Sequence, residues 1–152
     1  MQVATYEAPG WGVGELYLQE DRLLHHELPS ARTVREGAPH PLAERLRRYF
    51  EGAADDFADV ELDLFGATPF QRAVTDALRA VPYGETVTYG ELAALAGHPN
   101  AQRAAGTFCA GNRFAIVVPC HRVVAATGLG SYGSLGIEYK RRLLVLEGHE
   151  PF

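Results

Sequence analysis

One stretch of the chain, residues 115–124, constrains the fold more than any other. It opens with four apolar residues, Ala115–Val118, which predict a short buried strand. Pro119 has no backbone N–H, so we expect the strand to end there. The next residues, Cys120, His121 and Arg122, carry groups that packing alone does not require. A reactive cluster is therefore expected at the end of a buried element.

Cys120 is the candidate nucleophile of this cluster. A thiol reacts as the thiolate, and a neighbouring imidazole or guanidinium group favours that form or takes up the proton. Cys120 has both neighbours in the sequence. The alternative is that Cys120 is a small buried hydrophobic residue, which is the more common role of a single cysteine after a strand.

Three helix starts follow one another in the second half of the chain. Thr68–Gln71 and Thr88–Glu91 are capping boxes, which predict helices from Pro69 to about Ala80 and from Tyr89 to Leu95. Asn100 is the expected cap of a third helix, 101–110, that Gly111 ends. The second and third helices, joined by 97–99, predict a helix-turn-helix unit.

The third helix is poor in side chains that read the major groove of DNA. Most of its residues near the start are small, and Gln102 and Arg103 are its main polar groups. Small residues around one arginine suit the shallow minor groove. The alternative is a surface arginine on a helix that packs through its alanines.

The last predicted helix, 137–147, places Leu143, Leu144 and Leu146 inward and residues 140–142, a Lys-Arg-Arg run, on the surface. Glu147 ends this helix, where the helix dipole disfavours an anion. We expect a cation or a hydrogen-bond donor beside it, unless Glu147 is simply solvated.

The first half of the chain predicts a sheet with one helix. Residues 11–18 and 22–28 alternate as strands do, 42–50 has helical spacing, and 60–64 predicts one more strand. His25 and His26 would face opposite sides of a strand, which argues against a metal pair. The fold class is therefore α/β in an α+β arrangement: a small antiparallel sheet with a helix, then a mostly helical, winged-helix-like region. We place the boundary between 1–66 and 67–152.

Charge divides the chain at the same boundary. The whole chain has 152 residues and a net charge of -5. Residues 1–66 hold 13 acidic and 6 basic side chains (net -7), whereas 67–152 hold 6 and 8 (net +2). A surface that binds DNA phosphates must therefore belong to the second region.

The composition excludes several classes. No apolar run approaches the roughly 20 residues of a membrane span, and the first residues do not resemble a signal peptide, so we expect a cytoplasmic protein. Two cysteines, Cys109 and Cys120, fit a reducing compartment, and a bridge between them would remove the candidate nucleophile. The sequence has no cluster of Cys and His residues with the spacing of metal ligands, so we predict no metal site.

The motifs from Thr68 to Gly148 resemble those of the O6-alkylguanine-DNA alkyltransferases, also called methylated-DNA-protein-cysteine methyltransferases. They occur in the family's order and nearly its spacing. The matching segments are Thr68–Gln71, Pro82–Tyr89, Arg103–Gly106, Asn112, Pro119–Val123 and Leu143–Gly148.

This resemblance implies irreversible, single-turnover transfer of an alkyl group from O6-alkylguanine, and from O4-alkylthymine, to Cys120. It implies no cofactor, a ribonuclease H-like N-terminal domain and no structural zinc, since residues 1–66 lack cysteine. It also implies a monomer that binds duplex DNA through the minor groove without an obligate protein partner or a membrane.

The resemblance assigns roles to individual residues. Glu147 would orient His121, which would deprotonate Cys120 through a water, and Tyr89 would donate a proton to the guanine. The family position of Asn112 ties the recognition helix to the strand before the nucleophile. Arg103 would fill the space that the flipped nucleotide leaves. The residues assigned to DNA binding are Arg103, Gln71, Tyr89 and Gln102. The residues assigned to the substrate pocket are Tyr132, Val123, Gly133 and Ser134.

Two positions depart from the family pattern. Arg113 stands where proline is common, and the loop 130–136 is one residue longer than usual. Tyr132 is the expected aromatic lid of that loop, whereas either Gly133 or Ser134 could offer its N–H to guanine O6. Three other classes remain open: a lesion-binding protein without transfer activity, a thiol hydrolase and a transcription factor.

Overall fold

A computed structural model describes residues 1–31 and 37–150. The chain forms two compact units. The first unit comprises residues 1–63 together with 113–115, and the second comprises 64–112 and the chain from 116 onward. The short segment 113–115 thus belongs to the first unit although it lies far along the chain.

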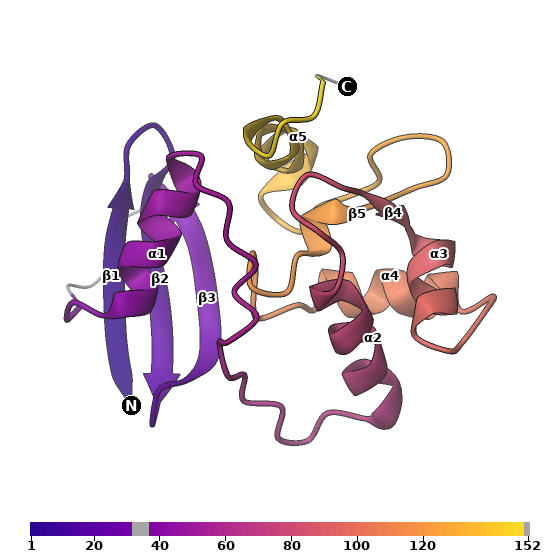
Figure 1. Cartoon of the computed structure of the whole chain (residues 1–152), viewed down its shortest axis with the longest axis horizontal. Helices are drawn as coiled ribbons and strands as arrows, with labels where there is room; N and C mark the ends of the chain where they lie inside the picture. Colours follow the sequence, from indigo (N-terminus) through magenta and orange to yellow (C-terminus); the bar gives the residue numbers. More distant parts are fainter. Residues whose placement is uncertain (32–36, 151–152) are drawn as a thin grey trace. The chain divides into compact units, whose positions relative to one another are not determined.

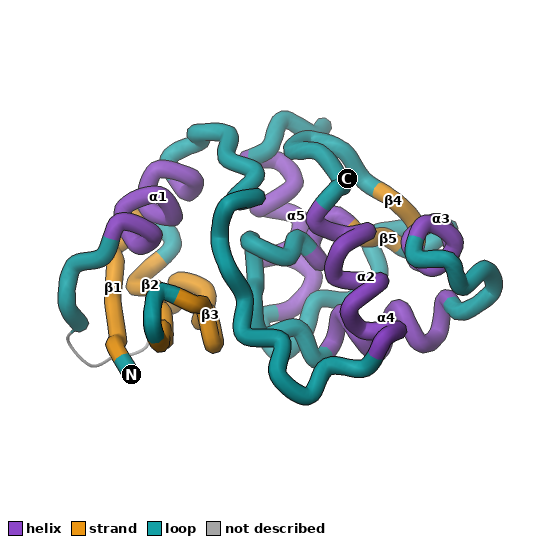
Figure 2. Tube along the Cα trace, turned by 60° about the horizontal axis from the view of Figure 1, so that its bottom comes forward, coloured by secondary structure: helices purple, strands orange, loops and turns teal. Residues whose placement is uncertain are grey.

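The first unit is a three-stranded antiparallel sheet covered by one helix (Figures 1 and 2). Its strands are β1 (Gln2–Ala8), β2 (Gly12–Gln19) and β3 (Arg22–Ser30), in that order across the sheet. Helix α1 (Pro41–Phe50) begins after His40, whose ring nitrogen accepts a hydrogen bond from the backbone of Leu42 at 3.0 Å. The strands predicted for 11–18 and 22–28 and the helix predicted for 42–50 are confirmed.

The strand predicted for 60–64 is wrong. Only Leu62 forms a bridge, to Leu23 of β3. The chain turns immediately before and after it, because Val60 N bonds Phe57 O at 3.1 Å and Ala67 N bonds Leu64 O at 3.0 Å. The alternation of apolar residues was real, but the segment is too short between its turns to extend the sheet.

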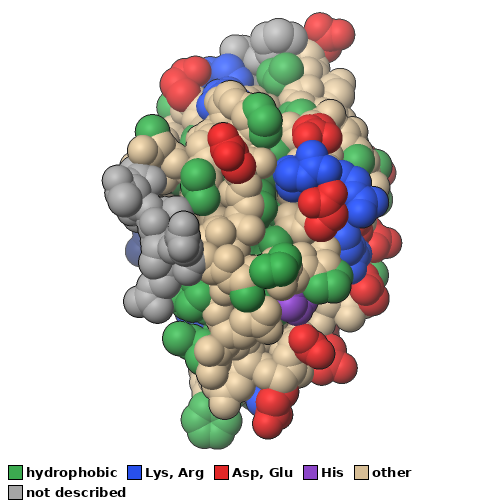
Figure 3. All heavy atoms as spheres, turned by 90° about the vertical axis from the view of Figure 1, so that its left-hand side faces the viewer, with side chains coloured by type: hydrophobic (Ala, Val, Ile, Leu, Met, Phe, Trp, Pro, Cys, Tyr) green, Lys and Arg blue, Asp and Glu red, His purple; other side chains and the backbone are tan. Residues whose placement is uncertain are grey.

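Charged side chains of both signs lie side by side on one face of the first unit (Figure 3). Arg45 of α1 bonds Asp55 and Asp59 at 2.9 Å, and its guanidinium lies 5.1 Å from the Phe57 ring centroid. Arg45 therefore fastens the acidic loop after α1 to the helix.

The second unit is mostly helical. Its helices are α2 (Pro69–Arg79), α3 (Tyr89–Leu95), α4 (Gln102–Ala110) and α5 (Gly136–Leu146), and its only regular strands in the described chain are β4 (Val87–Thr88) and β5 (Val123–Val124), which pair in parallel. Both predicted capping boxes are present, with Thr68 bonding Gln71 and Thr88 bonding Glu91 in both directions. Helices α3 and α4 pack against one another as the predicted helix-turn-helix. None of the helices within 1–31 and 37–150 has the length and apolarity needed to cross a bilayer.

Asn100 does not cap α4, contrary to the prediction. It has a φ of 71°, and Ala101 precedes the helix without a side-chain hydrogen bond. Asparagine tolerates the left-handed region better than most residues, and here it supplies that conformation to the turn instead of a cap.

The strand predicted for Ala115–Val118 is also wrong. The segment consists of turns, and Ile116 has a φ of 72°, which β-branched residues rarely adopt. Ile116, Val117 and Val118 are nevertheless buried. The apolar run indicated burial correctly, but a strand needs a partner over several residues. Among the described residues, the preceding Phe114 forms a single bridge, to His26, and 115–118 form none.

Candidate active site

Cys120 is the first residue of a single 3-10 turn, η1 (Cys120–Arg122), between the buried turns and β5. Its side chain belongs to the core, with 5% of the residue exposed. Asn112 Nδ2, just beyond α4, donates to the Val118 carbonyl at 2.8 Å and so ties the end of α4 to the turn before the nucleophile. Such a link is the role that the family resemblance implies for Asn112.

His121 and Glu147 meet inside the second unit although 26 positions separate them. His121 Nε2 lies 2.7 Å from Glu147 Oε2, and both side chains are fully buried. A carboxylate can only accept, so Nε2 carries the proton in this contact. Proton exchange with a thiol then falls to the other ring nitrogen, Nδ1.

Arg122 is a residue whose role the sequence analysis missed. Its Nε donates to Glu147 Oε1 at 2.8 Å, and its Nη2 donates to Oε2 at 3.0 Å. Its Nη1 donates to the Val81 carbonyl at 2.8 Å, and the Gly84 backbone adds a donor to Glu147 at 3.2 Å. These groups are the cation and the donor expected beside an acid at a helix C-terminus.

The environment fixes the charge of the pair. Burial opposes the ionisation of Glu147, but the hydrogen bond from His121 and the hydrogen bonds and charge of Arg122 outweigh it and hold the pKa of Glu147 well below its usual value. Burial lowers the pKa of His121 below 6.5, against the pull of Glu147. At neutral pH, His121 is therefore a neutral imidazole that can accept a proton.

Lys140 is buried, whereas the sequence analysis expected it on the surface. The residue has 0% exposure, its Nζ donates to the Ser131 carbonyl at 3.2 Å, and it lies 5.8 Å from the Tyr89 ring centroid. It occupies the same helix face as Leu143 and Leu144, three and four residues later. That spacing was the signal that could have found it.

The Cys120 thiol has Lys140, Asn112 and a second thiol as neighbours. Burial raises the pKa of Cys120 well above its usual value, and the hydrogen bond to Cys109 adds to this rise. The side chain of Asn112 and the charge of Lys140 act in the opposite direction. The thiol is therefore protonated at rest and needs a base for reaction.

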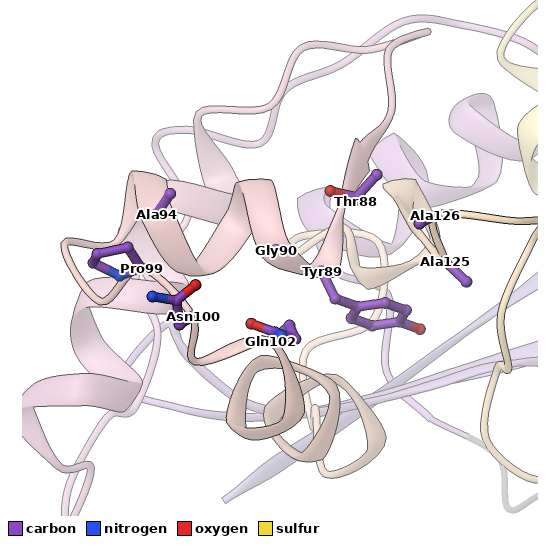
Figure 4. Close-up of a pocket in the computed structure, with 9 residues that line it drawn as sticks. All are labelled: Thr88, Tyr89, Gly90, Ala94, Pro99, Asn100, Gln102, Ala125 and Ala126. Carbon is purple, nitrogen blue, oxygen red and sulfur yellow. The ribbon is translucent and has the colours of Figure 1, made fainter.

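Tyr89, the first residue of α3, points into a groove on the second unit. Its ring lies between Gln102 of α4 and Ala125 (Figure 4). A Cβ added at Gly130 would lie 3.1 Å from the Tyr89 hydroxyl, so the loop can pass this close only as glycine, which also has a φ of 78°. Burial raises the pKa of Tyr89, and the thiols of Cys109 and Cys120 raise it further.

The groove consists of two adjoining hollows of about 530 and 820 Å³, which share Tyr89, Asn100 and Gln102. Arg103 lines the larger hollow from the exposed face of α4. Gln71 lies instead at the start of α2, where its side-chain oxygen accepts from Thr68 N at 2.9 Å. The structure thus brings Tyr89, Gln102 and Arg103 together on one groove and gives Gln71 a capping role.

The predicted pocket residues fall into two groups. Val123 and Tyr132 form the first group. Val123 is fully buried in β5. Burial, together with the Cys120 thiol, raises the pKa of Tyr132 well above its usual value. Tyr132 stacks on Tyr139 of α5, with centroids 6.4 Å apart. Gly133 and Ser134 are exposed. Arg113 belongs to the first unit, where its guanidinium donates to the Asp63 carbonyl at 3.1 Å.

Comparisons with known proteins agree on one family. The profile of the 6-O-methylguanine DNA methyltransferase, DNA binding domain, matches residues 69–149. A methylated-DNA–protein-cysteine methyltransferase from Mycolicibacterium paratuberculosis is 51% identical over 110 residues, which are 71% of this chain and 65% of that protein. The chain thus spans just under two thirds of that relative's length. The protein of the same name from Methanopyrus kandleri is 47% identical over 74% of this chain and 82% of its own length.

Solved structures resemble the chain over almost its whole length. The OGT of Mycobacterium tuberculosis in complex with DNA superposes with a TM-score of 0.82 at 39% identity, covering 97% of this chain and 93% of that one. The O6-methylguanine-DNA methyltransferase of Pyrococcus kodakaraensis superposes with a TM-score of 0.76 at 28% identity, covering 97% and 99%.

Proposed function

The chain belongs to the O6-methylguanine DNA methyltransferase family, and on this premise we propose that it repairs DNA by moving the alkyl group of O6-alkylguanine to the sulfur of Cys120. The observation that carries the proposal is the buried array of Cys120, His121 and Glu147. It combines a nucleophile, a base and an orienting acid, which nucleophilic catalysis requires.

The chemistry begins with proton removal. Neutral His121 takes the thiol proton through a water at Nδ1, while Glu147 stabilises the imidazolium that forms. The thiolate attacks the alkyl carbon, the carbon–oxygen bond breaks, and the guanine leaves as its electron pair is neutralised by a proton. Tyr89, beside both thiols, is the donor we assign to that step.

The product is a thioether, which is a very poor leaving group. No step returns Cys120, so each molecule reacts once and needs no cofactor. The same chemistry extends to O4-alkylthymine, whose alkyl group is likewise held on an oxygen of a base.

The target base must leave the duplex before a buried sulfur can reach it, at a cost of a few kcal/mol. We assign Arg103 to the space that the base vacates and Gln102 and Tyr89 to the surrounding minor-groove contact, because these residues line one groove beside α4. Gln71 would contact the flanking backbone. Tyr132, Val123 and the backbone at Gly133 or Ser134 would enclose the base.

We assign DNA binding and chemistry to the second unit and propose that the protein acts as a monomer inside the cell, where its DNA substrate lies. The fold of the first unit, a sheet with one covering helix, is compatible with a ribonuclease H-like domain. A lesion-binding protein without transfer activity is the competing class.

Intact mass spectrometry tests the proposal directly. The reduced protein is mixed with a duplex that contains one O6-methylguanine, and the expected result is a gain of one methyl group on a single tryptic peptide, Phe114–Arg122. Cys120→Ala is the matched control and should stay unmodified. An unchanged mass with the duplex bound and still methylated would establish the competing class instead.

The role of Arg103 is tested separately. Arg103→Ala should slow repair of the duplex much more than reaction with free O6-benzylguanine, because only the duplex requires a base to be flipped. Arg142→Ala, an exposed cation of α5, is the control for lost charge. Equal slowing of both reactions would remove the flipping role.

A further inference from the structure

A second thiol lies beside Cys120 without a part in the proposed repair reaction. Cys109 comes from the last turn of α4, where its carbonyl accepts a hydrogen bond from Asn112 N at 3.3 Å, and its thiol lies close enough to that of Cys120 for each to shift the pKa of the other. Both cysteines are free thiols in the structure. Two neighbouring thiols can form a disulfide where the backbone lets their sulfur atoms approach each other.

The backbone around the two thiols already holds them together. Asn112 follows α4 by two residues and bonds the Val118 carbonyl, two residues before Cys120. Cys120 N in turn bonds the same Val118 carbonyl at 2.8 Å. The two cysteines are therefore joined through a short, fixed segment, so closing a bond between them orders little additional chain.

Cys109 is also the more accessible thiol. It is partly exposed, whereas Cys120 is buried. On α4, Gly106 lies three residues before Cys109 and Ala110 lies one residue after it. Both line the open groove. Of the two thiols, the partly exposed Cys109 is therefore the one that a small oxidant from solvent reaches more readily.

The local charge favours reaction at that thiol. The hydrogen bond with Cys120 lowers the pKa of Cys109, and the positive charge of buried Lys140 acts in the same direction. Thiolates, not thiols, attack peroxides, and neighbouring cations make them more abundant.

We propose that Cys109 and Cys120 form a site of reversible oxidation by peroxides, in which an intramolecular disulfide switches the nucleophile off. The Cys109 thiolate attacks one peroxide oxygen. An S–O bond forms, the O–O bond breaks, and the other oxygen leaves and takes up a proton to give water or an alcohol. Sulfur loses the two electrons that the peroxide gains.

The Cys120 thiol then attacks the sulfenic sulfur of Cys109. The S–S bond forms, the S–O bond breaks, and hydroxide leaves with the thiol proton as water. Without Cys109, Cys120 should react only slowly with peroxide, because its thiol is buried and protonated. The loss of repair in the oxidised state rests on the proposed function, whereas disulfide formation does not.

The test treats the reduced protein with hydrogen peroxide and measures intact mass and free thiols. The wild type should lose two hydrogen atoms and both thiols, and dithiothreitol should restore both. Trypsin cleaves after Arg103, Arg113 and Arg122, so the oxidised protein should yield Ala104–Arg113 bonded to Phe114–Arg122. This mapping uses the wild type alone and does not depend on the folding of a variant.

Cys109→Ser is the matched variant. Under the same peroxide it should keep the Cys120 thiol and nearly all of its methyl uptake, whereas the wild type loses its methyl uptake and recovers nearly all of it with dithiothreitol. Before oxidation, reduced wild type and variant are both assayed for methyl uptake, so failure of the repair reaction is seen separately. Disulfide-linked dimers, or added oxygens in the wild type without the linked peptides, would overturn the proposal.

Discussion

The guanidinium of Arg122 and the carboxylate of Glu147 form a two-point contact inside the second unit, with Nε 2.8 Å from Oε1 and Nη2 3.0 Å from Oε2. The hydrogen bond from His121 and this contact with Arg122 together keep Glu147 ionised although it is buried. Glu147 can therefore orient His121 without drawing a proton from it. One arginine thus serves both the stability of the unit and the charge state of the base.

Removing Arg122 should leave a buried carboxylate without its cation. We expect Arg122→Met to lower the free energy of unfolding by about 3 to 5 kcal/mol, because breaking one side of a buried pair leaves an uncompensated charge. Urea unfolding at pH 7.5, followed by circular dichroism, measures the loss. Arg141→Met, which breaks the more exposed pair with Glu138, should cost at most about 1 kcal/mol.

A double variant strengthens this test. Adding Glu147→Gln to Arg122→Met should cost clearly less than the sum of the two single changes, because both partners of the charge pair are then gone. Additive losses would mean that Arg122 stabilises the unit through packing and its bond to Val81 instead.

Replacing Lys140 should separate reactivity from stability. The charge of Lys140 favours the Cys120 thiolate, so we expect Lys140→Met to slow reaction with free O6-benzylguanine about tenfold, the effect of one pKa unit on the thiolate population. The melting temperature should stay level or rise, since a buried charge is replaced by an apolar chain of similar length. An unaltered rate, measured at the same pH, would contradict a role for Lys140 in activating the thiol.

Gly130 should be required for the position of Tyr89. Gly130→Ala places a methyl group about 3.1 Å from the Tyr89 hydroxyl and 3.2 Å from Cε2, so the ring or the loop must shift to relieve the contact. We expect reaction with free O6-benzylguanine to slow at least tenfold, an order-of-magnitude expectation for a misplaced proton donor.

Gly66→Ala is the control for this change. Gly66 has a φ of 81°, close to the 78° of Gly130, but open space around its added Cβ. Both variants should lose about 1 kcal/mol of stability through left-handed strain, and only Gly130→Ala should react slowly. Equal rates in the two variants would show that Tyr89 need not be held there.

The stability of the first unit should fall in weak acid because of His26. Its Nδ1 donates to the Ala115 carbonyl and its Nε2 accepts from the Tyr6 hydroxyl, both at 2.7 Å, so the folded state holds the neutral ring. Burial lowers the pKa of His26 to about 4. Between this value and the ordinary 6.5, the unfolded chain binds more protons, so stability decreases as the pH falls through that window.

The expected loss is about 2 kcal/mol between pH 7.5 and pH 5 from His26 alone. Burial also lowers the pKa of His121, which acts in the same direction, so the comparison must be between wild type and His26→Gln. The variant should lose about 2 kcal/mol less over the same interval, measured by urea unfolding at both pH values. A parallel decline in the two proteins would assign the acid sensitivity to other groups.

The helices of the second unit were predictable because their signals are local. A capping box needs only four consecutive residues, and Thr68–Gln71 and Thr88–Glu91 supply their own hydrogen bonds. The family motifs likewise led to Cys120, His121 and Glu147 before any distance was known. The helix periodicity also indicates that Lys140 is buried, because Lys140 shares a face with Leu143 and Leu144. The prediction placed it on the surface because its side chain is charged.

The errors concern contacts between distant segments. The apolar run Ala115–Val118 predicts burial. It does not predict the left-handed φ of Ile116, nor whether another strand pairs with the run. Arg122 was visible beside the nucleophile, whereas its partner is an acid 25 positions away. Asn100 could serve as a cap or as a left-handed turn residue, and only the turn that follows α3 decides between them.

The placement of 113–115 in the first unit has a consequence for how the chain can be divided. A fragment starting at residue 64 would carry away the carbonyl of Ala115, to which His26 donates, and the backbone of Arg113, which accepts from His26 N at 2.8 Å. The other fragment would keep an unsatisfied imidazole inside its core. The two halves are therefore interleaved along the gene, and a recombination event or an engineered cut between them would have to transfer this three-residue segment as well.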